Sequence, residues 1–154
     1  MWALVVLVSM VAAMGAYMVS QEARTAPVAV AMDDQLARNL ALYRAIVVEH
    51  VRTHATAPGT VPDAALAFPG WYQRHSAWNN LVQADGTIVV YATQGMPATL
   101  PVRIAQLSQG SVLAGEARHR ANGDTYLHSP WHGDTGLALP ALDTGTVVWL
   151  ARLE

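Results

Sequence analysis

The sequence predicts an α+β protein in which an N-terminal transmembrane helix precedes a domain with one long amphipathic helix packed on a small antiparallel β-sheet. Three observations support this prediction. Residues 2–19 are apolar and uncharged, apolar side chains recur every three or four residues after residue 34, and β-favouring runs further on flank Asp-Gly and Asn-Gly turns. We therefore expect a membrane anchor at residues 1–20, a linker at 21–31 and an α+β domain at 32–154.

The anchor is predicted from the run Trp2–Val19, which holds eighteen residues without a charge. That length is at the short end of what crosses a bilayer as a helix. A helix is required because lipid offers no partner for backbone N–H and C=O groups. Trp2 and Tyr17 lie near the two ends, where aromatic side chains anchor a helix at the membrane interface.

Three other interpretations of this run have to be weighed against a membrane anchor. A cleaved secretory signal usually begins with basic residues, and none precedes Arg24, although small residues near Ala16 would permit cleavage. A lipoprotein signal is excluded because the chain has no cysteine. A buried helix of a soluble domain would be apolar on one side, whereas this run is apolar on every side.

The residues after the run give a weak signal for orientation. Arg24 is the one basic residue close to the span, and Glu22 balances it. By the positive-inside rule this leans slightly toward a cytoplasmic domain. Residues 21–31 are small and apolar, so they form either a stalk or a continuation of the anchor helix with a break near Pro27.

Composition limits the function of the remaining residues. About 130 residues follow the anchor, which is enough for one domain with a core of its own. The net charge is −2 and all nine basic residues are scattered arginines, so an electrostatic nucleic-acid binder is not expected. The absence of cysteine excludes disulfides and thiolate metal sites but leaves the redox compartment undetermined.

A long amphipathic helix is predicted to open at Asp33 and Asp34, either of which can cap it. Its apolar stripe has the spacing of one helix face and consists of Leu36, Leu40, Tyr43, Val47 and Val51. Pro58 and Gly59 end the helix. An apolar face of this length needs a layer to cover, and a sheet is the expected one.

The rest of the chain predicts a loop, two hairpins and a second helix. Residues 57–71 are rich in proline and glycine and are expected to form a loop. The other expected elements are a hairpin of Trp78–Val82 with Thr87–Thr93, a short helix Leu100–Ser108, a hairpin of Ser111–Arg120 with Thr125–His128, and a terminal strand Thr146–Leu153.

Two groups of polar residues were considered as chemical sites. His50 and His54 have a metal-ligand spacing, but Val51 stands where a metalloprotease has glutamate, so two histidines at a helix C-terminus are the simpler interpretation. His128, His132 and Asp134 cluster near a serine, yet the chain contains no GxSxG motif, and the segment is predicted to be a turn-rich loop. We therefore expect no catalytic residues, no metal ligands, no cofactor and no enzyme activity.

Two stretches of the chain resemble the PilM family of type IV pilus biogenesis proteins, which accompany the thin pili of conjugative plasmids and related type IVb systems. They are Tyr43–Asn80 and Ser129–Val148, which share the family's pattern of Pro, Gly, Trp and Asn positions. The resemblance implies a non-enzymatic, single-pass inner-membrane component of the pilin transport apparatus or the thin-pilus basal body. Its partners would be other type IV pilus assembly proteins or pilins, and its C-terminal domain would lie in the periplasm, against the Arg24 signal.

The predicted architecture also allows other functions. An apolar N-terminal helix with an amphipathic continuation and a small sheet is pilin-like, so the alternative is a minor pilin or pseudopilin in the filament. Prepilins typically carry a basic leader and an early glutamate, and here no acidic residue precedes Glu22. A third hypothesis is a periplasmic hydrolase or metal-binding protein that uses His128, His132 and Asp134.

A protein-interaction site is predicted at Trp71, Tyr72 and Arg74. These residue types are enriched in the energetic hot spots of interfaces. The competing interpretation is that Trp71 plugs the core of its own domain. The sequence leaves open which pilus component is bound and whether the chain forms an oligomer.

Overall fold

The computed structural model describes residues 30–153. The chain divides into two compact units, Met1–Met32 and Asp33–Glu154. The predicted anchor at residues 1–20 and nearly all of the predicted linker lie outside the described residues. Between residues 30 and 153 no helix is both long enough and apolar enough to cross a membrane. This finding contradicts the predicted localisation, a single-pass inner-membrane protein with a periplasmic domain.

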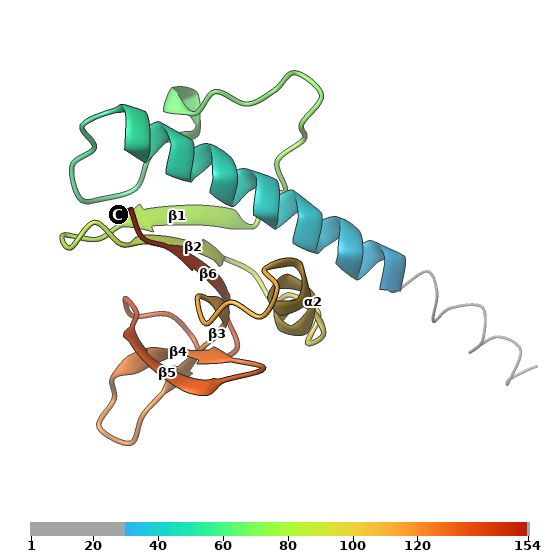
Figure 1. The fold of residues 1–154 in the computed structure, drawn as a ribbon, viewed down its shortest axis with the longest axis vertical. Coiled ribbons are helices and arrows are strands. Elements are labelled where there is room, and N and C mark those ends of the chain that lie inside the picture. The colour runs from blue at the N-terminus through green and yellow to red at the C-terminus, as the bar shows by residue number, and fades with distance from the viewer. Residues whose placement is uncertain (1–29, 154) are drawn as a thin grey trace, which may run out of the picture. The chain divides into compact units, whose positions relative to one another are not determined.

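The long helix is described over residues 30–53 and packs across one face of the sheet (Figure 1). Three residues of the predicted stripe, Leu40, Tyr43 and Val47, are at most 1% exposed. The predicted capping role of Asp33 and Asp34 is wrong, because the helix already includes residue 30. The Asp33 carboxylate instead accepts a hydrogen bond from the Thr99 hydroxyl just before the second helix.

The sheet has six strands in the order β1-β2-β6-β3-β4-β5, and all neighbouring strands are antiparallel. The strands are β1 (Trp78–Val82), β2 (Ile88–Ala92), β3 (Ala114–His119), β4 (Thr125–Ser129), β5 (Gly133–Ala138) and β6 (Val147–Ala151). The other elements are a 3₁₀ turn, η1 (Asp63–Ala65), and the helix α2 (Leu100–Leu107). The last strand of the chain thus inserts between the β1–β2 hairpin and the β3–β4–β5 meander.

Both predicted hairpin turns are present in the structure. Gly86 and Gly123 have φ angles of 81° and 89°, which an L side chain rarely adopts. The side chain one residue before each glycine accepts a backbone hydrogen bond across the turn, from Thr87 to Asp85 and from Asp124 to Asn122. The Asp-Gly and Asn-Gly pairs therefore fix these two turns through local chemistry alone.

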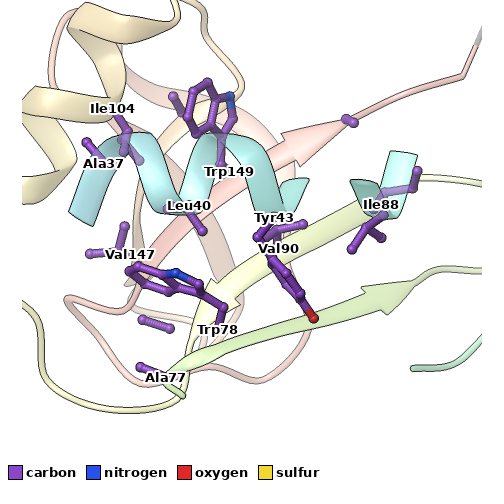
Figure 2. Packing of buried hydrophobic residues seen from close by; sticks show 14 of the residues in the cluster. Ala37, Leu40, Tyr43, Ala77, Trp78, Ile88, Val90, Ile104, Val147 and Trp149 are labelled. Atoms are coloured by element: carbon purple, nitrogen blue, oxygen red, sulfur yellow. The ribbon is translucent and has the colours of Figure 1, made fainter. Parts of the chain in front are cut away.

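The sheet carries a hydrophobic core on each face. The first core lies between the sheet, the long helix and α2; Figure 2 shows Ala37, Leu40, Tyr43, Ala77, Trp78, Ile88, Val90, Ile104, Val147 and Trp149 within it. The second core lies on the opposite face and consists of Val89, Ala117, Leu127, Leu139, Val148 and Leu150. The strands β2 and β6 contribute to both cores and are consequently buried from two sides.

β6 is shared by both cores and is buried along its whole length. Val147, Trp149 and Ala151 point to the first core, and Val148 and Leu150 point to the second. A strand covered on both faces needs apolar side chains at every position, because alternate side chains point to opposite faces. This explains why its sequence is a continuous apolar run.

The predicted fold class, a transmembrane helix followed by a pilin-like domain, is wrong. A pilin-like domain has one long helix that dominates a small sheet, whereas this structure is mostly a six-stranded antiparallel sheet with two helices. The difference arises after His128. Residues 129–136 were expected to form a turn-rich loop, but Gly133–Ala138 form β5 and pair with β4 through a register shift between Tyr126 and His128.

The outer edge of β1 is paired with other parts of the same chain. Val82 exchanges two backbone hydrogen bonds with Gly59, with N···O distances of 2.9 and 2.8 Å. The carbonyl of Trp78 accepts a hydrogen bond from the Arg74 guanidinium. These contacts use backbone groups that a free edge would offer to another strand.

The outer strand β5 is irregular and carries local side-chain hydrogen bonds. The Asp134 carboxylate accepts the backbone N–H of Gly136 at 2.8 Å. The Thr135 hydroxyl accepts the backbone N–H of Leu137 at 3.3 Å and donates to the Leu127 carbonyl of β4 at 2.8 Å, so it bridges the irregular pairing of β4 and β5. Together with the register shift, these bonds make β5 an irregular edge.

Candidate interaction site

Asn80 of β1 holds the start of the segment between the long helix and β1 by hydrogen bonds, and its side chain is buried, at 1% exposure. Its Oδ1 accepts the backbone N–H of Val61 at 2.8 Å. Its Nδ2 donates to the carbonyl of Val61 at 3.0 Å and to the Tyr43 hydroxyl at 2.8 Å. Since a buried amide is costly unless its bonds are made, this arrangement fixes the start of the loop against both the sheet and the helix.

Asn39 of the long helix makes a second set of hydrogen bonds to the same segment. Its Oδ1 accepts hydrogen bonds from the Trp78 indole at 2.7 Å, the Tyr72 hydroxyl at 3.1 Å and the His75 backbone at 3.2 Å. Its Nδ2 donates to the carbonyl of Gln73 at 2.8 Å. One helical side chain therefore holds residues 72–78 in place.

Two of the three predicted interaction residues, Tyr72 and Arg74, help to hold this segment in place. The Tyr72 ring packs against Phe68 with centroids 5.6 Å apart, and its hydroxyl donates to Asn39. Burial raises the pKa of Tyr72 well above its ordinary value, so the hydroxyl keeps its proton and acts as a donor. Tyr72 thus supports the loop.

Arg74 also holds the loop together. Its guanidinium forms an ion pair with Asp63 at 2.8 Å, donates to the Trp78 carbonyl, and lies 5.6 Å from the centroid of the Tyr43 ring. With three partners in its own chain and a side chain that is 26% exposed, Arg74 offers little free surface to a partner protein. We therefore assign Arg74 a structural role.

Trp71 is the member of the predicted trio that faces solvent. Its side chain is 75% exposed, so it does not plug the core. Its ring meets the Tyr72 ring edge-on, with centroids 6.5 Å apart. A large exposed indole on a loop held from both sides has the residue type and the pre-ordering that are typical of interface hot spots.

The helix histidines form a local pair. The rings of His50 and His54 are stacked, 4.4 Å apart at 14°. Nδ1 of His54 donates to the carbonyl of His50 at 3.0 Å, because a carbonyl can only accept. Residues 30–153 contain no group of three or more His, Cys, Asp or Glu side chains placed to hold a metal ion.

The residues of the predicted hydrolase cluster are bound to different partners. Nε2 of His132 donates to the carbonyl of Gly110 at 2.7 Å. The Asp134 carboxylate binds the Gly136 N–H and the Arg120 guanidinium, at 2.8 and 2.9 Å, and these bonds hold the pKa of Asp134 below its ordinary value. His128 pairs across strands with Asp134, but its buried Nδ1 has no hydrogen-bond partner among the described residues.

Sequence reasoning missed Trp131 as an exposed residue. It lies in the β4–β5 turn and is 53% exposed. Its ring covers Gly110 so closely that a Cβ there would be 2.5 Å from two ring atoms. The turn after α2 therefore depends on Trp131 for packing, while one side of the indole faces solvent.

The comparisons with known proteins agree on one family. The profile of the PilM family matches residues 6–150. The chain is also similar to the crystal structure of a protein described as PilM from Escherichia coli B7A, with 21% identity and a TM-score of 0.55, over 79% of this chain and 93% of that one; at this identity the similarity shows a common fold. No curated protein matches the chain. Because the profile spans nearly the whole sequence, the chain belongs to the PilM family of pilus-related proteins.

Proposed function

We propose that this protein is a non-enzymatic component of type IV pilus assembly that acts through contacts with other pilus proteins, and that Trp71 lies at the centre of one such contact. Membership of the PilM family supports the link to pilus assembly. Trp71 is exposed on a loop that side-chain hydrogen bonds hold in place, and this observation supports a function through contacts with other proteins.

The energy available at Trp71 is sufficient for a specific contact. A tryptophan side chain buries roughly 200 Å², and each Å² of apolar surface contributes about 25 cal/mol. Since the side chain is 75% exposed, covering it would contribute about 4 kcal/mol, which corresponds to roughly 500-fold in the dissociation constant. The loop is already ordered by Asn39 and Asn80, so little of this energy is lost to ordering on binding.

The non-enzymatic part of the proposal rests on how the polar clusters are used. His132 and Asp134, the residues that a hydrolase would need free, bind Gly110, Gly136 and Arg120 of their own chain. These bonds join the β4–β5 turn to the turn after α2 and shape the edge of the sheet. We propose that the cluster maintains the fold.

The test is complementation of a strain that lacks the gene. We expect the deletion to abolish surface pili and the wild-type gene to restore them. The Trp71→Ala variant should fail to restore pili while its abundance and unfolding midpoint stay near wild type, because an exposed side chain contributes about 0.5 kcal/mol or less to folding. Pili are counted by electron microscopy, and unfolding is followed by circular dichroism.

Two control variants separate the alternatives. Trp71→Phe keeps an aromatic side chain and should restore at least part of the piliation. His132→Ala should restore it fully, since the proposal gives this residue no catalytic role. Normal pili with Trp71→Ala would remove the residue from the contact, and normal pili in the deletion strain would refute the role in assembly. Recovery of the protein in sheared filaments would identify a filament subunit instead.

A further inference from the structure

A groove lies between the long helix and α2, which are neighbours in the fold (Figure 1). It encloses about 240 Å³ and is lined by Asp34, Arg38, Arg103, Gln106 and Leu107. Its two walls are fixed relative to each other, because Ala37 and Ile104 are both fully buried in the first core and Asp33 binds Thr99 just below. The groove is therefore a preformed feature of the domain.

The groove has more positive charge than residues 30–153 neutralise. Nη1 of Arg103 donates to Gln106 at 3.0 Å, and Nε of Arg103 lies 3.5 Å from Asp34, which is long for a hydrogen bond. Arg38 is exposed and forms no ion pair or hydrogen bond with another described residue. The nearby Asp33 is buried and is occupied by Thr99. Two guanidinium groups thus line the groove beside one carboxylate, which is loosely paired with Arg103.

An apolar side chain borders the same groove. Leu107, the last residue of α2, is 41% exposed. One turn and a half earlier, Val102 is also 41% exposed on this helix. A partner that offers a carboxylate beside an apolar side chain would match both the charge and the apolar rim.

We propose that this groove docks an acidic segment of a partner protein, with one carboxylate between Arg38 and Arg103 and an apolar side chain against Leu107. Guanidinium groups recognise carboxylates through paired, charge-assisted hydrogen bonds, which makes arginine well suited to this contact. That the partner is a pilus protein rests on the proposed function. The docking itself rests on the groove.

A protein segment fits these residues better than an anionic membrane surface. Binding to anionic lipid through charge usually requires a cluster of four or more basic residues. Here two arginines stand beside Asp34, and the whole chain has a net charge of −2. One carboxylate would balance the groove, whereas a sheet of anionic headgroups would meet repulsion around it.

The test is a charge-reversal suppressor experiment with the full chain in the deletion strain. Arg38→Glu alone and with Arg103→Glu should lower the number of surface pili at least about tenfold, because a carboxylate would face a carboxylate. Suppressor mutations that restore pili should then replace an acidic residue of another pilus protein by lysine or arginine. Arg52→Glu is the matched control: it makes the same change on an exposed arginine of the same helix, outside the groove, and should leave piliation intact.

Each outcome decides the proposal. Wild-type pili with Arg38→Glu would overturn it, even if the deletion strain has none, so its failure is distinct from failure of the proposed function. The single variant guards against misfolding, since Arg38 is exposed, and its unfolding midpoint should match wild type. Suppressors that map only within this chain, or purified protein that binds phosphatidylglycerol vesicles through Arg38, would also overturn docking of a protein segment.

Discussion

At the scale of single residues, the tightest constraint in the domain is at Gly115 of β3. A Cβ built there would be 2.0 Å from the carbonyl oxygen of His128 and 3.0 Å from Cα of Ser129. Both are backbone atoms of β4, so a side chain cannot be accommodated by rotating a neighbour. The close approach of β3 and β4 thus depends on the absence of one methyl group.

We predict that Gly115→Ala destabilises the domain by about 3 kcal/mol or more, because the strands must separate to admit the methyl group. The free energy of unfolding is measured by urea denaturation. Gly95→Ala is the control, since a Cβ at Gly95 meets no atom within 4 Å in the part of the chain that the structure describes. A Gly115→Ala variant as stable as Gly95→Ala would contradict the observed approach of the strands.

At the scale of elements, the contact between the long helix and the following loop depends on a single amide. Asn39 receives three donors and gives one hydrogen bond to residues 72–78. No other side chain of the helix makes as many hydrogen bonds to this segment among the described residues. The backbone next to Trp71 is therefore positioned by Asn39, through the bonds of Tyr72 to this residue.

We predict that Asn39→Ala lowers the free energy of unfolding by about 2 kcal/mol, because the Trp78 indole and the His75 amide lose a shared acceptor. Amide hydrogen exchange should accelerate over residues 72–78 and stay slow in β3 and β4. Gln35→Ala is the control, since Gln35 is exposed on the same helix. Equal exchange rates in the two variants would show that the loop is held by other contacts.

Sequence patterns were sufficient for local elements and failed where distant residues decide the outcome. The stripe through Leu40, Tyr43 and Val47 and the two glycine turns follow from periodicity and backbone preference, which act within a few residues. β5 was missed because Gly133 and Gly136 favour turns, and pairing with β4 overrides that preference.

The contacts of the three predicted interaction residues could not be predicted from the sequence for the same reason. Trp71, Tyr72 and Arg74 are neighbours in the sequence and belong to residue types that interfaces favour equally. The Tyr72 hydroxyl is hydrogen-bonded to Asn39, 33 residues away. The Arg74 guanidinium forms an ion pair with Asp63 and donates to a backbone carbonyl. Such partners appear only after folding, so the sequence could not show that Trp71 alone is exposed.

At the scale of the whole molecule, the two cores are joined through β6. This strand is the last of the chain, yet it lies in the middle of the sheet, between β2 and β3. The β1–β2 hairpin and the β3–β4–β5 meander make their sheet contacts with each other through it. The domain therefore completes its hydrogen-bonded sheet only when its final residues are present.

We predict that a chain ending at Thr146 does not fold cooperatively, because both cores lose their shared strand. Circular dichroism and the dispersion of proton NMR signals measure this. A chain ending at Ala151 removes exposed residues after β6 and should unfold at nearly the wild-type temperature. Cooperative unfolding of the shorter chain would mean that one core is stable alone.

The two outer strands of the sheet determine whether a second chain can extend it by strand pairing. Another chain could extend the sheet at β1 only after breaking the bonds between Gly59 and Val82, and at β5 only by pairing with an irregular strand. Growth by stacking strands, the route by which many sheets become fibres, thus meets a barrier at both ends. Both features disfavour joining the sheet of this domain to that of a second copy.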